Sequence, residues 1–494
     1  MMENNANNPK KIHTVETIEI KDVTADSAVT GREGESVQCH RLTGLEWFFH
    51  QHKDKLPLIH LIMFVVFLVL LFVPLFLPEP SEQATPLDNF TIFTNYLMWG
   101  LWFPLVFLSV IFTGRSWCGL LCPMGAASEW ANKRGLQKAV PAFIRWEGMP
   151  IVSFLIITFL GQTVGVRDHP EALAEVFGGV MLLAIIVGFI WGTKNRVWCR
   201  HMCPIGLLLG LFSRLGVVQF NSKKPKAGGD KYDQHSFCPT MIDLRQKRES
   251  RHCIECFRCV TPDAKSSVMV NIRKPGKEVE EIKTHNPGTA EVWFFLLGTG
   301  SALGGFLWLT LPEYEVMRQA LGEWFISKEM YWIGESGPWW LMSVHPERRE
   351  VFNWLDFFSI VGFMSLVTII FTLVLGTINA LTTSVAKAAG SIDSYVQSYK
   401  ELAYQYMPVA MVSLLIGLGG KLFEWLTIFG LDNSALTLIK LTLFGFSILW
   451  SLWLGWNILA RQHVTTRARI LPTVTGALGS LFVGLCWWPA IFGL

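Results

Sequence analysis

Long apolar runs separated by polar loops dominate the hydrophobicity pattern of this chain. About 20 consecutive apolar residues are enough for a helix to cross the hydrocarbon core of a bilayer. Nine runs of roughly that length can be recognised, at residues 56–77, 92–113, 150–166, 176–192, 292–311, 357–381, 407–430, 436–459 and 470–494. The pattern therefore predicts an all-α polytopic membrane protein with about nine transmembrane helices.

The polar segments between these runs divide the chain into four parts. Residues 1–55 are polar and have no sustained period, so we expect a cytoplasmic tail that is partly disordered. We expect residues 56–220 to form a four-helix membrane unit, 221–291 a small inserted cytoplasmic module, and 292–494 a five-helix membrane unit. The last unit contains a long outer loop at 313–353, whose Trp residues predict either an interfacial helix or a docking surface for an external partner.

Composition supports a protein embedded in a lipid bilayer. The 494 residues are 51% hydrophobic and only 16% charged, whereas about a quarter of the residues of soluble proteins are charged. These values exclude an ordinary soluble enzyme. They give no indication of nucleic-acid binding, because the basic residues are concentrated in a few loops.

The distribution of Lys and Arg predicts the orientation of the chain. The loop 79–90 has none of these residues, whereas 114–148 and 193–291 are rich in them. Loops rich in Lys and Arg stay in the cytoplasm. We therefore expect a multi-pass protein of the bacterial cytoplasmic membrane, with its N-terminus and cysteine-rich loops in the cytoplasm and its C-terminus outside.

A nine-residue motif occurs twice, as Trp-Cys-Gly-Leu-Leu-Cys-Pro-Met-Gly at 117–125 and as Trp-Cys-Arg-His-Met-Cys-Pro-Ile-Gly at 198–206. Each copy follows an apolar span, so both end a helix on the same side of the membrane, as parallel repeats do. Proline starts a helix more readily than it continues one. We therefore expect a helix break at each Cys-Pro, with four thiols meeting near the cytoplasmic surface: Cys118, Cys122, Cys199 and Cys203.

The sequence leaves several uses for these four thiols open. We favour a second [4Fe-4S] cluster or a related redox centre, but transient copper binding and dithiol chemistry would use the same residues. Free cysteines are also often small buried apolar residues without a ligand. Repetition of the whole motif argues against that last interpretation.

A second group of cysteines has the spacing of an iron-sulfur site. Ferredoxins hold a cubane cluster with a Cys-x-x-Cys-x-x-Cys run and take a fourth thiolate from a distant Cys-Pro. In ferredoxins a further cysteine follows the third one after three residues. Asp263 occupies that position here, four residues after Cys259, and is an alternative fourth ligand. Structural zinc sites usually pair two distant Cys-x-x-Cys knuckles, so zinc fits poorly. We predict a ferredoxin-like module with one [4Fe-4S] cluster held by Cys238, Cys253, Cys256 and Cys259.

Other polar residues give less specific patterns. Arg251 and Arg258 would offset the negative charge of a cluster, or would only add to the cytoplasmic positive charge. Lys421 and Glu424 lie one turn apart in a predicted span, which indicates a quinone pocket or a self-contained ion pair. A haem with two histidine ligands is not favoured, because His60 alone lies in a predicted span. The outer half shows no cofactor pattern.

The two Cys-x-x-x-Cys-Pro motifs, the basic stretch around Arg214 and the His-Cys-Ile-Glu-Cys-Phe-Arg-Cys run at 252–259 resemble a known family. It is the membrane-bound polyferredoxin family of NapH and the C-terminal part of NosR, with a more distant similarity to the oxidase-assembly protein CcoG. The resemblance covers roughly residues 56–283 and implies electron transfer at the cytoplasmic membrane, commonly in support of a periplasmic metalloenzyme or its maturation. The chain departs from the family in keeping about one complete ferredoxin motif and in its spans after residue 292.

Two functions from different classes follow from these observations. The first is an electron-transfer subunit, rather than a stand-alone enzyme. It would pass single electrons between a cytoplasmic or quinone donor and redox partner proteins, such as a membrane or periplasmic metalloenzyme or its maturation system. The second is a copper-handling or transport protein that uses the repeated thiols, since thiolates prefer soft ions. A redox-sensing scaffold is a third hypothesis.

Overall fold

The structure is a computed structural model that describes residues 40–81, 84–193, 195–223, 238–244, 247–262, 267–346, 350–428 and 430–492. Eight helices in this part of the chain are long and apolar enough to cross a membrane. They are Thr43–Phe76, Phe90–Thr113, α8 (Pro170–Ile190), α12 (Thr289–Thr310), α14 (Trp354–Ala388), Tyr395–Leu418, α18 (Asn433–Arg461) and α19 (Ile470–Phe492). The predicted all-α polytopic class is therefore confirmed.

Three of these spans are built from several helical segments. The first contains α1 (Thr43–His52), η1 (Lys53–Lys55), α2 (Leu56–Phe72) and η2 (Val73–Phe76). The second contains α3 (Phe90–Tyr96), the π-helical turn η3 (Leu97–Trp102) and α4 (Phe103–Thr113). The third contains α15 (Tyr395–Ala403), η9 (Tyr404–Tyr406) and α16 (Met407–Leu418), and α17 (Gly420–Ile428) follows it.

The first helix begins at Thr43, inside the segment that we expected to be a polar tail. Its start is held by Glu46, whose buried carboxylate accepts hydrogen bonds from the Arg41 guanidinium (3.1 Å from Nε) and from the backbone N–H of Val270 (2.8 Å). Helical structure therefore extends beyond the apolar run because a charged residue anchors it to another part of the chain. The rest of the expected tail, residues 1–39, lies outside the described residues.

The span expected at 150–166 is the helix α7 (Met149–Thr163), which has 15 residues. At about 1.5 Å per residue it is about 22 Å long, shorter than the hydrocarbon core of about 30 Å. It packs against α12 and α14. One side of α7 therefore contacts other helices, while Val152 and Ile156 on it stay exposed. It is not one of the eight long spans.

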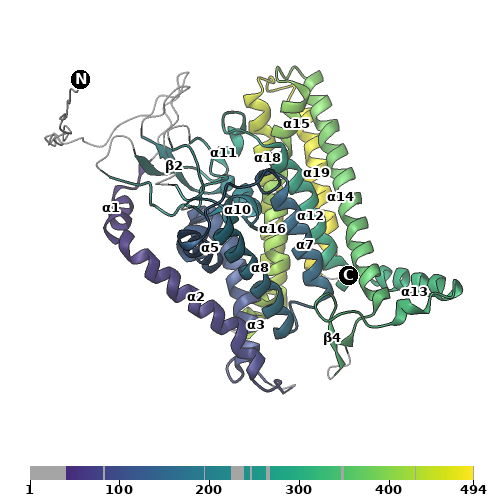
Figure 1. Cartoon of the computed structure of the whole chain (residues 1–494). Coiled ribbons are helices and arrows are strands. Elements are labelled where there is room, and N and C mark those ends of the chain that lie inside the picture. The colour runs from purple at the N-terminus through teal and green to yellow at the C-terminus, as the bar shows by residue number, and fades with distance from the viewer. Residues whose placement is uncertain are drawn as a thin grey trace, which may run out of the picture. The chain divides into compact units, whose positions relative to one another are not determined.

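The polar elements gather at two ends of the helical bundle (Figure 1). One end holds β2 (Val218–Ser222), β3 (Val268–Ile272) and α11 (Lys277–Glu280), and Phe220 of β2 lies opposite Val270 in the antiparallel pair. The opposite end holds α13 (Pro312–Ser327) and the hairpin of β4 (Val344–His345) and β5 (Glu350–Val351). Helices such as α14 connect the two ends.

Small residues allow the central helices to approach closely. A Cβ atom added to Gly304 of α12 would lie 3.0 Å from the Cα atom of Met364 in α14, and one added to Gly300 would lie 3.1 Å from the Cα atom of Thr368. Such contacts let van der Waals packing hold membrane helices together, where a hydrophobic driving force is lacking. The backbones of α12 and α14 therefore lie in close contact along this pair of helices.

Candidate functional site

The four cysteines of the predicted ferredoxin-like module lie together, although Cys238 precedes the other three by 14 intervening residues or more. They line a single pocket together with Phe220 and Lys247. A hydrogen bond from the backbone N–H of Ile242 to the sulfur of Cys238 (3.4 Å) fixes the distant member of the group. We call this group the loop site: Cys238, Cys253, Cys256 and Cys259.

The backbone conformation of the loop brings the three nearby thiols to one pocket. Glu255 and Phe257, on either side of Cys256, have φ values of +52° and +57°. Residues other than glycine seldom adopt this left-handed conformation, and alternation of right- and left-handed residues points successive N–H groups inward to bind anions. The loop is therefore shaped to surround a negatively charged group, and a helix would not bring these thiols together.

Burial makes ionisation of these thiols costly. It raises the pKa of Cys253 to about 12, against the opposing effect of the Lys247 ammonium. The pKa of Cys259 lies well above its ordinary value because of burial and then because Cys253 and Cys256 are close to it. Only thiolates bind metal, and metal binding therefore releases their protons. An iron-sulfur cluster fits this site, because its iron ions supply the positive charge that the crowded thiolates need.

The repeated motifs also bring their thiols together. Cys118 lies in the π-helical turn η4 (Trp117–Leu121), and α5 (Pro123–Arg134) begins directly after Cys122, as expected for a Cys-Pro break. In the second copy, α9 (Val197–His201) contains Cys199. The pKa of Cys199 is raised to about 12, mainly by burial and also by nearby Cys122 and Cys118 from the other copy, against the opposing effect of Arg196. We call Cys118, Cys122, Cys199 and Cys203 the repeat site.

The glycine that ends each motif leaves room for the thiols. A Cβ atom added to Gly125 would lie 3.1 Å from the sulfur of Cys199, and one added to Gly206 would lie 3.1 Å from the Cβ atom of Cys203. These separations are tighter than normal van der Waals contact. The motif therefore repeats its glycine because a side chain there would crowd the cysteines.

Two buried arginines lie beside the repeat site. Arg115 and Arg196 are 3% and 0% exposed, and the guanidinium of Arg196 donates to the backbone oxygen of Cys118 (2.9 Å). Among the described residues, Arg115 Nε and Arg196 Nη2 have no hydrogen-bond partner. Buried donors of this kind normally have an acceptor. Sulfur of an iron-sulfur cluster would accept these hydrogen bonds. The positive charge of the two guanidinium groups would offset the negative charge of the thiolates.

The loop site and the repeat site are in direct contact. A Cβ atom added to Gly119, in the first motif, would overlap the backbone oxygen of Ile254 and lie 2.8 Å from the backbone nitrogen of Cys256. The carbonyl of Gly119 is also within hydrogen-bond distance of His60 Nε2 (3.1 Å) in α2. The polypeptide that holds one set of thiols therefore packs against the polypeptide that holds the other.

A carboxylate in α5 joins the same two segments. Glu129 is buried and accepts hydrogen bonds from Arg196 (2.8 Å) beside the repeat site and from Arg258 (2.7 and 2.8 Å) in the loop site. Burial alone would raise the pKa of Glu129, but the two guanidinium groups lower it below its ordinary value. Sequence reasoning did not place Glu129, Arg196 or His60 in contact with the cysteine segments, because their spacing relative to the cysteines follows no motif.

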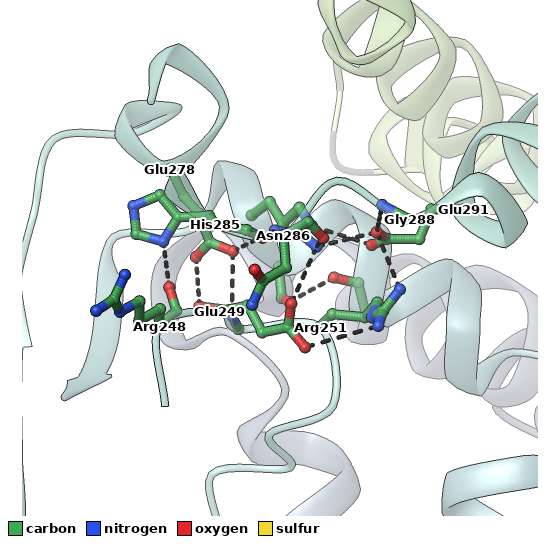
Figure 2. Close-up of polar contacts among 12 residues, drawn as sticks. Arg248, Glu249, Arg251, Glu278, His285, Asn286, Gly288 and Glu291 are labelled. Carbon is green, nitrogen blue, oxygen red and sulfur yellow. Dashed lines mark hydrogen bonds and ion pairs between the residues drawn. The ribbon is translucent and has the colours of Figure 1, made fainter. Parts of the chain in front are cut away.

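The other charged residues that the sequence analysis considered have structural contacts. Arg251 forms ion pairs with Glu249 (3.7 Å) and Glu291 (3.3 Å), as Figure 2 shows. The Lys421 ammonium contacts the side-chain oxygen of Asn95. The side chain of Glu424 and the whole of Asp263 lie outside the described residues. The predicted ion pair and the alternative cluster ligand therefore stay predictions.

Arg214 is the centre of the buried ion network around Arg251. Its guanidinium donates to Glu278 (2.8 Å) and Glu291 (2.9 Å), and all three side chains are fully buried. Glu278 also accepts from the backbone N–H of Ser250 (3.0 Å), three residues before Cys253. Figure 2 shows Glu278 and Glu291 on either side of this loop. The network ties the cysteine loop to α12.

These features define a multi-pass membrane protein with two adjacent groups of four buried or partly buried cysteines. A family described as a 4Fe-4S binding domain matches residues 96–140 and 176–225, which contain both repeated motifs. Among curated proteins, an uncharacterised protein of Methanocaldococcus jannaschii is 28% identical over 156 residues, which cover 30% of this chain and 61% of that protein.

Two further relatives have descriptive names. The ferredoxin-type protein NapH of Escherichia coli is 25% identical over 30% of this chain and 58% of its own length. The regulatory protein NosR of Pseudomonas aeruginosa is 24% identical over 35% of this chain and 28% of its own length. The matched segment thus spans less than two thirds of each of these three proteins. No solved structure matches the chain. The predicted resemblance to the NapH and NosR type of membrane protein is confirmed.

Proposed function

We propose that this chain is a membrane-bound electron-transfer protein with two [4Fe-4S] clusters, one in the loop site and one in the repeat site. The observation that carries this proposal is the presence of two groups of four buried or partly buried cysteines whose supporting backbones touch. The match of a 4Fe-4S binding domain to the repeated motifs supports a cluster there. Ferredoxin spacing supports the cluster in the loop site.

A bound [4Fe-4S] cluster supplies reversible one-electron transfer. The chain's own residues would hold the iron through eight thiolates and offset the resulting charge with Arg115, Arg196 and Arg258. Burial limits the access of water to both sites, and hydrogen bonds to sulfur, net charge and exposure together set the reduction potential of such a cluster. The contact of Gly119 with Cys256 places the two sites beside one another, so an electron that enters one can pass to the other.

We further propose that the cysteine end faces the cytoplasm, as the excess of basic residues in its loops indicates. Electrons would then pass between a cytoplasmic or quinone donor and a membrane or periplasmic metalloenzyme, or the system that matures it. The two relatives with descriptive names are described as a ferredoxin-type protein and a regulatory protein. A role in support of a redox partner agrees with the first description.

The metal content of the anaerobically purified full-length protein tests the proposal. Two clusters predict about eight iron and about eight acid-labile sulfide per chain, with a paramagnetic signal that develops on reduction with dithionite. Absence of both iron and sulfide would contradict the proposal. Stoichiometric copper in their place would favour the copper-handling alternative, whose soft ligands would be the same thiols.

Replacing Gly119 by alanine tests the contact between the two sites. The added methyl group has no space against the Ile254 carbonyl, so we expect the loops to move apart, at a cost of about 1–3 kcal/mol for overpacking. Iron per chain should fall, and electron exchange between the remaining clusters should slow, as freeze-quenched EPR after partial reduction would record.

Gly179→Ala is the matched control, because a Cβ atom on Gly179 in α8 would have no neighbour within 4 Å. It should keep the iron content and electron exchange of the unmodified protein. Equal behaviour of the two variants would show that the contact at Gly119 does not support the sites.

A further inference from the structure

We propose that a second kind of metal site, with nitrogen and oxygen ligands, lies at the end of the bundle opposite the cysteines. Its ligands are His169, Glu171 and His345, whose ligand atoms all lie within 4.8 Å of one another. Imidazole and carboxylate together suit borderline divalent ions such as zinc, copper or iron. This is a site for a single ion, and its chemistry differs from that of the sulfur-rich sites.

Two segments far apart in the chain build this group. His169 is the residue before α8 and is buried, and His345 comes from β4. The imidazole rings stack with centroids 3.8 Å apart and an angle of 16° between their planes. A hydrogen bond from the backbone N–H of Ser343 to the carbonyl of Thr163 (2.8 Å) holds the β4 segment against the end of α7. The backbone therefore fixes the meeting of the two histidines.

The surroundings of the histidines have the features of a supported metal site. His169 Nε2 lies 3.0 Å from a carboxylate oxygen of Glu350, and the other oxygen of Glu350 accepts from the Ser343 hydroxyl (2.7 Å). A carboxylate partner that orients an imidazole is the usual second contact of a metal-bound histidine. Gly165 has a φ of +68°, and a Cβ atom there would lie 2.9 Å from the His169 ring. The turn thus leaves the ring just enough space.

The ligand spacing is close to what a bound ion requires. Zinc binds nitrogen and oxygen at about 2.0–2.2 Å, so two ligand atoms on one ion lie at most about 4.4 Å apart. For both imidazoles to bind one ion, the His345 ring has to leave its stacked position, and rotation of the His345 and Glu171 side chains then brings the ligand atoms to that separation. Glu171 is exposed and His345 is half-buried, so both can rotate without disturbing the core, and an ion can reach them from solvent.

The histidine site and the cysteine sites lie near opposite ends of α8. Helix α8 has 21 residues and is therefore about 30 Å long. His169 precedes its first residue, and at its other end the Asn132 side chain of α5 donates to the backbone oxygens of Gly188 and Trp191 (2.8 Å each). Figure 1 shows β4 at the opposite end of the bundle from β2. The two kinds of site are thus separated by about the thickness of a bilayer core.

Zinc binding to the purified full-length protein in detergent tests this proposal. After dialysis against zinc, absorption at the zinc K-edge reports the ligands without interference from iron. We expect one zinc per chain with a nitrogen and oxygen shell near 2.0–2.1 Å, and at least a tenfold weaker affinity in His345→Ala and Glu171→Gln. His52→Ala, a histidine that contacts only the Phe48 carbonyl among the described hydrogen bonds, is the control and should bind as tightly as the unmodified protein.

Three results would overturn the proposal. They are the absence of zinc, a shell of sulfur near 2.3 Å, which would place the ion at the cysteines, and equal affinity in His345→Ala and the control. Because His345 and Glu171 are not buried, the variants should keep their helix content, and circular dichroism checks this. If any of the three results were found, the role of the stacked histidines would be to hold the β4 segment in place.

Discussion

Replacing Cys253 by alanine is expected to remove about half of the iron from the anaerobically purified protein, and replacing Cys203 by alanine should remove the other half. Each variant deletes one of the four thiolates of one site, and a [4Fe-4S] cluster held by four cysteines accounts for about four iron per site. Alanine leaves no oxygen or sulfur that could act as a substitute ligand. Iron and sulfide analysis counts the clusters, and EPR of the reduced variants assigns each signal to a site.

Cys486→Ala is the matched control for both substitutions. Cys486 is a partly buried free cysteine in α19, away from both groups, so its removal should leave all the iron in place. Full iron content in Cys203→Ala would show that the repeated thiols hold no cluster. Loss of all iron in either variant would show that the two sites assemble only together. The contact between them at Gly119 would then be the structural reason for this dependence.

Replacing Arg214 by methionine is expected to destabilise the protein by about 3 kcal/mol. Removing one partner from a buried ion pair costs about 3–5 kcal/mol, because the other charge stays buried without compensation. Glu278 keeps Arg273 and Glu291 keeps Arg251 as partners, so we expect the lower end of that range. The free energy of unfolding in an SDS titration, followed by circular dichroism, measures the loss.

Arg461→Met provides the comparison for this prediction. Arg461 also pairs with a glutamate, Glu281 (2.9 Å), but it is 44% exposed, and exposed ion pairs contribute about 0–1 kcal/mol. If both substitutions destabilised the protein equally, the buried network would have no special role. Arg214→Met should in addition loosen the backbone of the loop site. Arg214 pairs with Glu278, and Glu278 accepts the hydrogen bond from the backbone N–H of Ser250.

The sequence predicted the parts of the fold that depend on local patterns. Apolar length identified the long helices, and the spacing of the cysteines identified both groups of thiols that the structure brings together. The limits of this approach are clear at two helices. Helix α1 begins at Thr43 because Glu46 bonds to the distant backbone of Val270. The apolar helix α7 has only 15 residues and packs against α12 and α14. Composition alone predicts neither the early start of α1 nor the short length of α7.

The residues around the sites could not be found from local patterns. Glu129 and Arg196 are 67 residues apart, and His169 and Glu350 are 181 residues apart. Such pairs depend on how helices pack in three dimensions, which no single-sequence spacing encodes. The sequence therefore located the thiols but missed the buried charges between them, and it gave no sign of the histidine pair at the other end of the bundle.

The position of every thiol of the two groups at one end of the bundle has an electrical consequence. An electron that left this end for a partner on the opposite face would carry negative charge through the transmembrane voltage. Each roughly 100 mV of voltage changes the free energy of such a step by about 2.3 kcal/mol per elementary charge. With a negative interior and the cysteines on the inside, an energised membrane would drive electrons outward and oppose their return.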